Sequence, residues 1–133
     1  MTSTRFSLLA GAIAGAVAVA LGAFGAHALR SALDERALAT WHTAVDYQFW
    51  HALALLAVGL LTRATSTGES STRASKIAAV AFVVGIALFC GSLYALALGA
   101  PHIVGVITPL GGVALIAGWL ALAVHAVRDA ARQ

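Results

Sequence analysis

The sequence predicts an all-α membrane protein, a bundle of four helices that each cross a bilayer. Of its 133 residues, 61% are hydrophobic and only 10% are charged, a composition typical of polytopic membrane proteins and not of soluble domains. Residues 77–127 contain no Asp, Glu, Lys or Arg. Because one bilayer crossing takes about 20 apolar residues, this run holds two spans. The Gly-Ala-Pro sequence at residues 99–101 supplies the turn between them.

The first span is predicted at residues 6–29, after a short basic start that ends in Arg5. An alternative is a cleaved signal peptide, because the Ala-His-Ala sequence at residues 26–28 resembles a cleavage site, although the apolar run before it exceeds the ~7–15 residues of a signal core. Small residues recur at every fourth position of this span and allow a second helix to pack closely. The glycines expected at helix-packing positions, in this span and in later ones, are Gly11, Gly15, Gly22, Gly25, Gly91, Gly111 and Gly112.

A short interfacial helix is predicted at residues 30–40, between spans one and two. Ser31 is its expected N-cap, and the acidic residues after it suit a first helical turn. The apolar residues share one side, so this helix lies on the membrane surface or runs directly into the second span, predicted at residues 44–62. Only residues 47–62 of that span are uncharged, about 24 Å of helix against a hydrocarbon core of about 30 Å. We therefore expect Asp46 at the interface, within reach of Arg30 or Arg36.

The second half of the chain carries two further spans and decides the orientation. A polar loop at residues 63–76 precedes the third span, predicted at residues 77–98, and the fourth is predicted at residues 103–127, so that residues 1–133 form a single integral membrane domain. Six of the eight Lys and Arg residues fall on the side that holds both termini and the second loop, so both termini are expected in the cytoplasm.

The single cysteine, Cys90, excludes an intrachain disulfide. Trp119 is expected in the core and His125 at the cytoplasmic interface beside Arg128.

A polar face on the second span is the main candidate for function. On a helical projection Gln48 and His51 fall near Tyr47, whereas Phe49 and Trp50 fall elsewhere around the helix. Because unpaired polar side chains are costly at membrane depth, this face should point into the bundle. Polar residues of all four spans are expected at a similar depth, in the outer leaflet. They form a candidate polar pocket whose members are His27, Tyr47, Gln48, His51, Ser92, Tyr94 and Thr108.

Two members of this candidate pocket lie on the same span and point apart. Ser92 and Tyr94 are about 200° from each other on a regular helix. Both can face one pocket only if the third span is distorted near Gly91.

His27 and His51 are candidate ligands for a metal ion or for haem, because neutral imidazole binds both. The chain has no CxxCH or HExxH motif and no pair of cysteines. The favoured interpretation is that the two histidines hydrogen-bond to backbone carbonyls, Gln48 or Tyr47 and fasten the helices, so no cofactor is predicted. The sequence also has no Ser-His-Asp arrangement, phosphate-binding loop or basic-aromatic surface. Hydrolase, kinase and nucleic-acid-binding functions therefore lack support.

Four strings of the sequence closely resemble one family. They are GAFGAHAL at residues 22–29, TAVDYQFWHALALL at 43–56, LFCGSLYALAL at 88–98 and TPLGGVALIAGWLALA at 108–123. The chain resembles the domain of unknown function 423 family, YgdD-like small inner-membrane proteins with transmembrane protein 256 as their eukaryotic relative. The resemblance implies a four-span integral protein of the bacterial inner membrane with no assigned activity. It assigns no catalytic or binding role to any residue.

These observations predict a non-enzymatic structural or accessory membrane protein. Its expected partners are the lipid bilayer and either further copies of itself or a larger membrane complex, reached through the small-residue face of span one. The alternative is a binding or transport module that holds a metal, haem, quinone or small lipophilic ligand in the outer-leaflet pocket.

Overall fold

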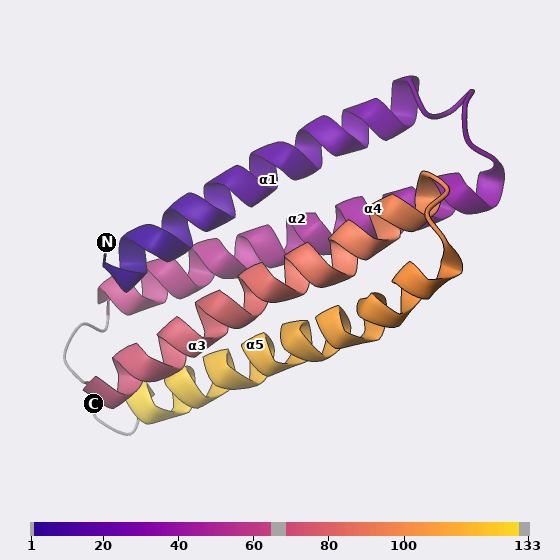
Figure 1. Cartoon of the computed structure of the whole chain (residues 1–133). Helices are drawn as coiled ribbons and strands as arrows, with labels where there is room; N and C mark the ends of the chain where they lie inside the picture. Colours follow the sequence, from indigo (N-terminus) through magenta and orange to yellow (C-terminus); the bar gives the residue numbers. More distant parts are fainter. Residues whose placement is uncertain (1, 65–68, 131–133) are drawn as a thin grey trace.

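The computed structural model of the chain describes residues 2–64 and 69–130, which are helical almost throughout. Four segments are long and apolar enough to cross a membrane (Figure 1), which confirms the predicted all-α class. The elements in chain order are α1 (Ser3–His27), α2 (Glu35–Ala64), α3 (Glu69–Gly85), the π-helical turn η1 (Ile86–Cys90), α4 (Gly91–Ala97), the 3₁₀ turn η2 (His102–Val106) and α5 (Ile107–Ala130).

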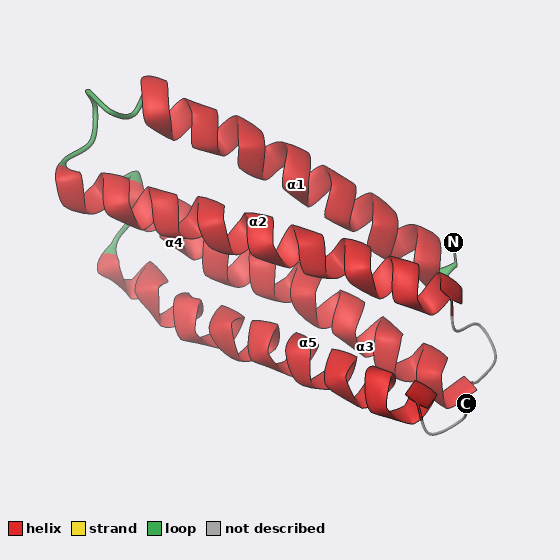
Figure 2. Cartoon of the chain, turned by 180° about the vertical axis from the view of Figure 1, so that it is seen from behind, coloured by secondary structure: helices red, strands yellow, loops and turns green. Residues whose placement is uncertain are grey.

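The four segments form two antiparallel pairs that lie side by side (Figure 2). α1 packs along α2, and α5 packs along α3 and η1. α2 also contacts α3, η1 and α4, so it joins the two pairs and leaves α1 and α5 on opposite sides. α1 begins and α5 ends at the same end of the bundle, while the α1–α2 and α4–α5 connections lie at the other (Figure 1). We call these the terminal end and the connection end.

The core is divided between the two ends of the bundle. Leu55 of α2, Phe82 of α3 and Leu115 of α5 belong to one buried cluster, in which alanines fill the remaining positions. Small alanine side chains let the helix backbones approach each other closely. Trp41 and Ala97 belong to a second cluster, which includes the first residues after α1. α2 contributes to both clusters and is therefore the most buried of the four spans.

The separate interfacial helix predicted at residues 30–40 is not confirmed. Residues 28–33 form turns, and α2 runs without a break from Glu35 to Ala64, so the alternative that this helix continues directly into the second span is found. The N-cap is Asp34 and not Ser31, because Asp34 Oδ1 accepts a hydrogen bond of 2.7 Å from the backbone N–H of Ala37. The second membrane-spanning helix therefore begins well before the predicted residue 44.

The third span contains an irregular turn. η1 adopts a π-helical turn between α3 and α4, directly before Gly91. At this level α5 comes very close, because a Cβ atom added to Gly111 would lie 2.7 Å from Phe89 Cα. The turn after α4 lies where the sequence predicts it: Gly99 has a φ of 92°, a left-handed conformation that glycine adopts without strain.

Two predictions for α5 are wrong, and for the same reason. The buried face of α5 includes Gly111, Leu115 and Gly118 at helical spacing, and His125 lies seven residues after Gly118 on that face. His125 is therefore buried, only 1% exposed, instead of reaching the interface. Trp119, expected in the core, lies at the edge of this face and is 49% exposed.

Candidate functional site

The polar face of α2 points into the bundle, as predicted. Gln48 is 5% exposed and His51 is 6% exposed, whereas Phe49 and Trp50 are 40% and 54% exposed. The sequence forces this orientation because an amide and an imidazole at membrane depth need hydrogen-bond partners, while Phe and Trp can face lipid.

Gln48 connects α2 to two other spans. Its Nε2 atom donates a hydrogen bond of 2.9 Å to the carbonyl oxygen of Ala14 in α1. Its Oε1 atom accepts a hydrogen bond of 2.9 Å from the hydroxyl of Tyr94 in α4. Since Oε1 and Nε2 both have partners, the side-chain amide is held in one orientation and links three helices.

Ser92 connects α4 to α5 and does not share a site with Tyr94. The Ser92 hydroxyl lies 2.7 Å from the Thr108 hydroxyl and donates a hydrogen bond of 2.9 Å to the carbonyl oxygen of Phe89. Because Ser92 has a single hydroxyl hydrogen, Thr108 is the donor in the bond between them. The distortion anticipated near Gly91 is present, but it precedes both residues, so Ser92 faces α5 while Tyr94 faces α2.

Both ring nitrogens of His51 are in use. The Trp119 indole nitrogen, which can only donate, lies 3.2 Å from His51 Nε2. His51 Nε2 is therefore the acceptor, and Nδ1 carries the hydrogen that it donates to the Tyr47 carbonyl oxygen at 2.6 Å. This neutral tautomer leaves no imidazole lone pair for a metal ion or haem. The aromatic rings of Tyr47, Phe82 and Trp119 surround it at 5.7 to 6.1 Å between centroids.

His27 does not join His51. It is exposed at the last residue of α1, where Gly25 faces Trp41 of α2. His51 follows Trp41 by almost three helical turns, which places it about 15 Å further along the bundle. One metal ion needs ligands at about 2 Å, so the two histidines cannot share it. Within residues 2–64 and 69–130 no group of three His, Cys, Asp or Glu residues could hold a metal ion.

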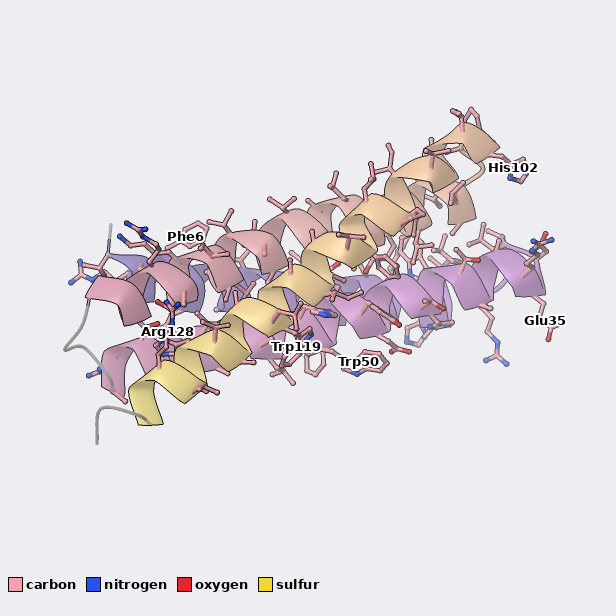
Figure 3. All side chains as sticks on the ribbon, turned by 90° about the horizontal axis from the view of Figure 1, so that it is seen from below. Phe6, Glu35, Trp50, His102, Trp119 and Arg128 are labelled. Carbon is pink, nitrogen blue, oxygen red and sulfur yellow. The ribbon has the colours of Figure 1, made fainter. Side chains whose placement is uncertain are left out.

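Gln48 and His51 lie near the middle of the bundle's length. Gln48 bonds to Ala14, which is near the middle of α1, and Trp50 and Trp119 lie between the two ends of the bundle (Figure 3). Four other members of the candidate pocket lie towards the connection end: His27, Ser92, Tyr94 and Thr108.

The polar residues bond to one another or to the backbone, and Gln48 also borders a groove described below. No buried side-chain nitrogen or oxygen in the described parts of the chain lacks a hydrogen-bond partner. The Tyr47 hydroxyl is a different case, because it is not fully buried, and it makes no hydrogen bond to the residues that the structure describes. Tyr47 packs its ring against Phe89 and Trp50, with centroids 4.7 and 5.2 Å apart.

One interaction between α1 and α2 was missed from the sequence. Trp41 is 3% exposed, and its indole nitrogen donates a hydrogen bond of 2.9 Å to the Leu21 carbonyl oxygen. A Trp beside a charged segment such as residues 30–36 is typical of an interfacial anchor, whereas Trp41 is buried. Gly25 is the signal that could have revealed the contact, since its missing side chain leaves room for this indole.

The small-residue face of α1 is filled by α2. A Cβ atom added to Gly11 would lie 2.9 Å from the Ala52 carbonyl oxygen, and one added to Gly25 would lie 2.7 Å from the Trp41 ring. Gly22 also faces α2 closely, because a Cβ atom there would lie 3.3 Å from Val45 Cγ1, whereas Gly15 faces Ala52 at an ordinary 3.8 Å. Gly112, on α5, faces the Phe89 ring at 3.7 Å. This face is therefore used inside the bundle and is not free for a partner.

The remaining glycines divide differently from the prediction. Gly91, expected at a packing position, has nothing within 4 Å of the place where a Cβ atom would stand. Three glycines that the sequence did not single out are close-packed instead: Gly59 against Leu8, Gly85 against Leu115 and Gly118 against Phe82.

A lateral groove of about 280 Å³ is the apolar concavity nearest to Gln48. It lies between α1 and the third span, above α2, and Gln48 forms part of its floor. The other lining residues are Ala10, Ile13, Ala14, Val17, Leu55, Val83 and Ile86.

Comparisons with known proteins agree with this fold. A family model described as "Protein of unknown function (DUF423)" matches residues 21–112. The chain is 44% identical over 121 residues to the UPF0382 membrane protein YwdK of Bacillus subtilis (strain 168), covering 91% of this chain and 95% of that protein. It is 40% identical over 130 residues to the UPF0382 inner membrane protein YgdD of Escherichia coli (strain K12), covering 96% and 93% respectively. No solved structure matches the chain.

Proposed function

The chain belongs to the DUF423 family of proteins of unknown function, whose relatives are named membrane proteins, and on this premise we propose that it acts without catalysis, as a structural or accessory component of the bacterial inner membrane. Neither of the two relatives described above carries the name of an enzyme. Its partners would be the bilayer and either further copies or a larger membrane complex. Both termini would lie in the cytoplasm, as the distribution of Lys and Arg favours.

The observation that carries this proposal is the closed hydrogen-bond network. Gln48 and His51 are buried polar residues of α2. Their side-chain nitrogen and oxygen atoms form hydrogen bonds to other helices or to the backbone of α2. A catalytic or ligand-binding group needs at least one free donor or acceptor that faces a cavity. The arrangement of these two residues instead suits a role in fastening the four spans to one another.

The test is absorbance spectroscopy and metal analysis of the full chain, purified in mild detergent, together with chemical cross-linking in native membranes. We expect no chromophore or metal at one per chain, and a reproducible cross-linked species larger than the monomer. A stoichiometric metal or chromophore that disappears in His51→Ala and persists in Leu53→Ala would contradict the proposal. Leu53 is a matched control because it lies on the same helix and is 51% exposed.

A second candidate function is the binding of a lipophilic chain, and the lateral groove favours it. Its lining is apolar apart from Gln48, and it opens sideways within the membrane-spanning region. Mass spectrometry of the purified chain would show a co-purifying lipophile, which Val83→Trp should displace by filling the groove. Val80→Trp is the control, since Val80 lies on the same helix, outside the groove lining, and is 54% exposed. Equal retention by both variants would rule this function out.

A further inference from the structure

The outward face of α2 carries polar groups that the bundle does not satisfy. Its exposed residues follow a spacing of three and four along the helix, which forms a continuous stripe. The half towards the connection end is polar and the other half is apolar. The stripe consists of Glu35, Ala39, His42, Asp46, Phe49, Leu53, Ala57 and Leu60.

With α1 centred in the bilayer, helix lengths place Asp46 deeper than a hydrated interface. α1 has 25 residues, about 37 Å of helix, so a hydrocarbon core of about 30 Å leaves roughly 4 Å of helix outside at each end. Gly22 faces Val45 of α2 and lies five residues before the end of α1, about 7 Å along its axis. Asp46, next to Val45, therefore lies about 4 Å inside the hydrocarbon, where an exposed carboxylate is costly.

None of the described residues relieves this cost. The expected ion pair between Asp46 and Arg30 or Arg36 does not form, and in the part of the chain that the structure describes the Asp46 carboxylate has no hydrogen-bond partner. His42, one turn earlier on the same stripe, is also exposed and makes no hydrogen bond to a described residue. The stripe thus presents an acceptor and a donor side by side, one turn apart.

From this juxtaposition we infer that α2 is the interface between two copies of the chain, in which His42 of each copy pairs with Asp46 of the other. Two copies with the same orientation can be related by a two-fold axis along the membrane normal, which sets their α2 helices parallel. Residues one turn apart then meet diagonally across the axis, so His42 of each copy can reach Asp46 of the other. The stripe is complementary to itself under that axis, because an imidazole and a carboxylate one turn apart can exchange partners across it. Phe49 and Leu53 would pack against the second copy on the side of these polar pairs that faces the terminal end.

A second copy fits better than a lipid or an unrelated protein. A lipid headgroup remains at the membrane surface and does not reach a carboxylate inside the hydrocarbon. An unrelated protein would have to supply both a donor and an acceptor at this depth, whereas a copy supplies them by symmetry. The proposal does not depend on the proposed function, since the dimer would form whether or not the bundle holds a ligand.

Disulfide cross-linking in native membranes tests the interface. In a Cys90→Ala background, Leu53→Cys should give a species of twice the chain mass on mild oxidation. Leu120→Cys is the control, because Leu120 is 63% exposed on α5 and lies at nearly the same depth, next to Trp119, which bonds to His51. Equal cross-linking of the two variants, or cross-linking of Leu53→Cys to a different protein, would overturn the proposal.

A charge swap tests the pairing itself. On the Leu53→Cys background, Asp46→Asn and His42→Asp should each lower the yield of cross-linked dimer by about three- to tenfold. The double variant His42→Asp with Asp46→His should restore it, because the pairs then form with their members exchanged. Since both side chains are exposed, the monomer should keep its helix content and melting temperature in all of these variants. An unchanged yield in Asp46→Asn, or no recovery in the double variant, would contradict the pairing.

Discussion

Gln48 links three of the four spans through one amide group. Its nitrogen and its oxygen bond to Ala14 of α1 and to Tyr94 of α4. In a membrane each such bond contributes only about 0.6–2 kcal/mol, because polar groups of the unfolded chain also find partners in the bilayer. The bonds are directional, however, so they fit only one relative placement of the three helices. The amide therefore adds modest stability and strong specificity.

Replacing this amide should weaken the bundle measurably. Gln48→Leu keeps a similar volume and removes both hydrogen bonds, so we expect the free energy of unfolding to fall by about 1–3 kcal/mol. Tyr94→Phe removes only one of them and should cost about half as much. Chemical unfolding in detergent micelles, followed by helix content, gives both values. If the variant that combines Gln48→Leu with Tyr94→Phe were no less stable than Gln48→Leu alone, the hydrogen bond between Gln48 and Tyr94 would be confirmed. Unchanged stability in Gln48→Leu would contradict the stabilising role of the amide.

Cys90 should be inert in the folded bundle. It is 1% exposed and is the single thiol of the chain. A reagent must reach the sulfur atom, and close packing between helices prevents this. We expect a small maleimide to leave the native protein unmodified and to add once per chain after unfolding in denaturing detergent, as measured by mass spectrometry. Rapid native labelling would show that the third span opens near η1.

The orientation of individual residues was easier to predict than their partners. The inward direction of Gln48 and His51 follows from the cost of exposing them to lipid, which depends on α2 alone. Their partners depend on how far α1 and α5 slide against α2, and that register is set by distant contacts such as Gly25 with Trp41. His27 and His51 were grouped in one candidate pocket because both are polar, and only the register shows that they lie apart.

At the scale of the helix, charge did not reveal where the second helix begins. Asp46 was taken to mark the membrane boundary, although the helix continues outward for eleven more residues to Glu35. The Asp34 cap and the packing of Trp41 against α1 stabilise that extension. Hydropathy identifies which helices are long and apolar enough to cross a membrane. It does not show at which residue a cap begins a helix that extends beyond the bilayer.

The close approach between η1 and α5 should make Gly111 sensitive to any side chain. A Cβ atom there would overlap the backbone of Phe89, which another helix holds in place, so we expect Gly111→Ala to lower the free energy of unfolding by about 1–3 kcal/mol or more. Gly91→Ala is the matched control, because nothing lies within 4 Å and alanine favours the helix, a gain of up to about 1 kcal/mol. Thermal unfolding of the two variants should thus shift in opposite directions. Equal shifts would show that η1 relaxes to accept the methyl group.

For the whole molecule, the number of long apolar helices was predictable and their pairing was not. Composition and an uncharged run are enough to count four such helices. The sequence suggested that a partner protein binds the small-residue face of α1, whereas α2 packs against the glycines of this face. The outer sides of α1 and α5 remain exposed. A sequence shows that a face allows close packing, but not which of several apolar helices will fill it.

The orientation of the bundle in the membrane is the prediction that belongs to this scale. Arg5, Arg63 and Arg128 lie at the terminal end, and Arg30 and Arg36 lie at the connection end. The positive-inside rule therefore predicts that the terminal end faces the cytoplasm. In a Cys90→Ala background, a membrane-impermeant maleimide added to intact spheroplasts should label Ser31→Cys and leave Thr2→Cys unlabelled until the cells are lysed. Both positions are exposed, so accessibility to the reagent does not differ for other reasons. Labelling of Thr2→Cys alone would reverse the orientation. Labelling of both would indicate that two copies insert in opposite directions, which would also exclude the parallel α2 dimer.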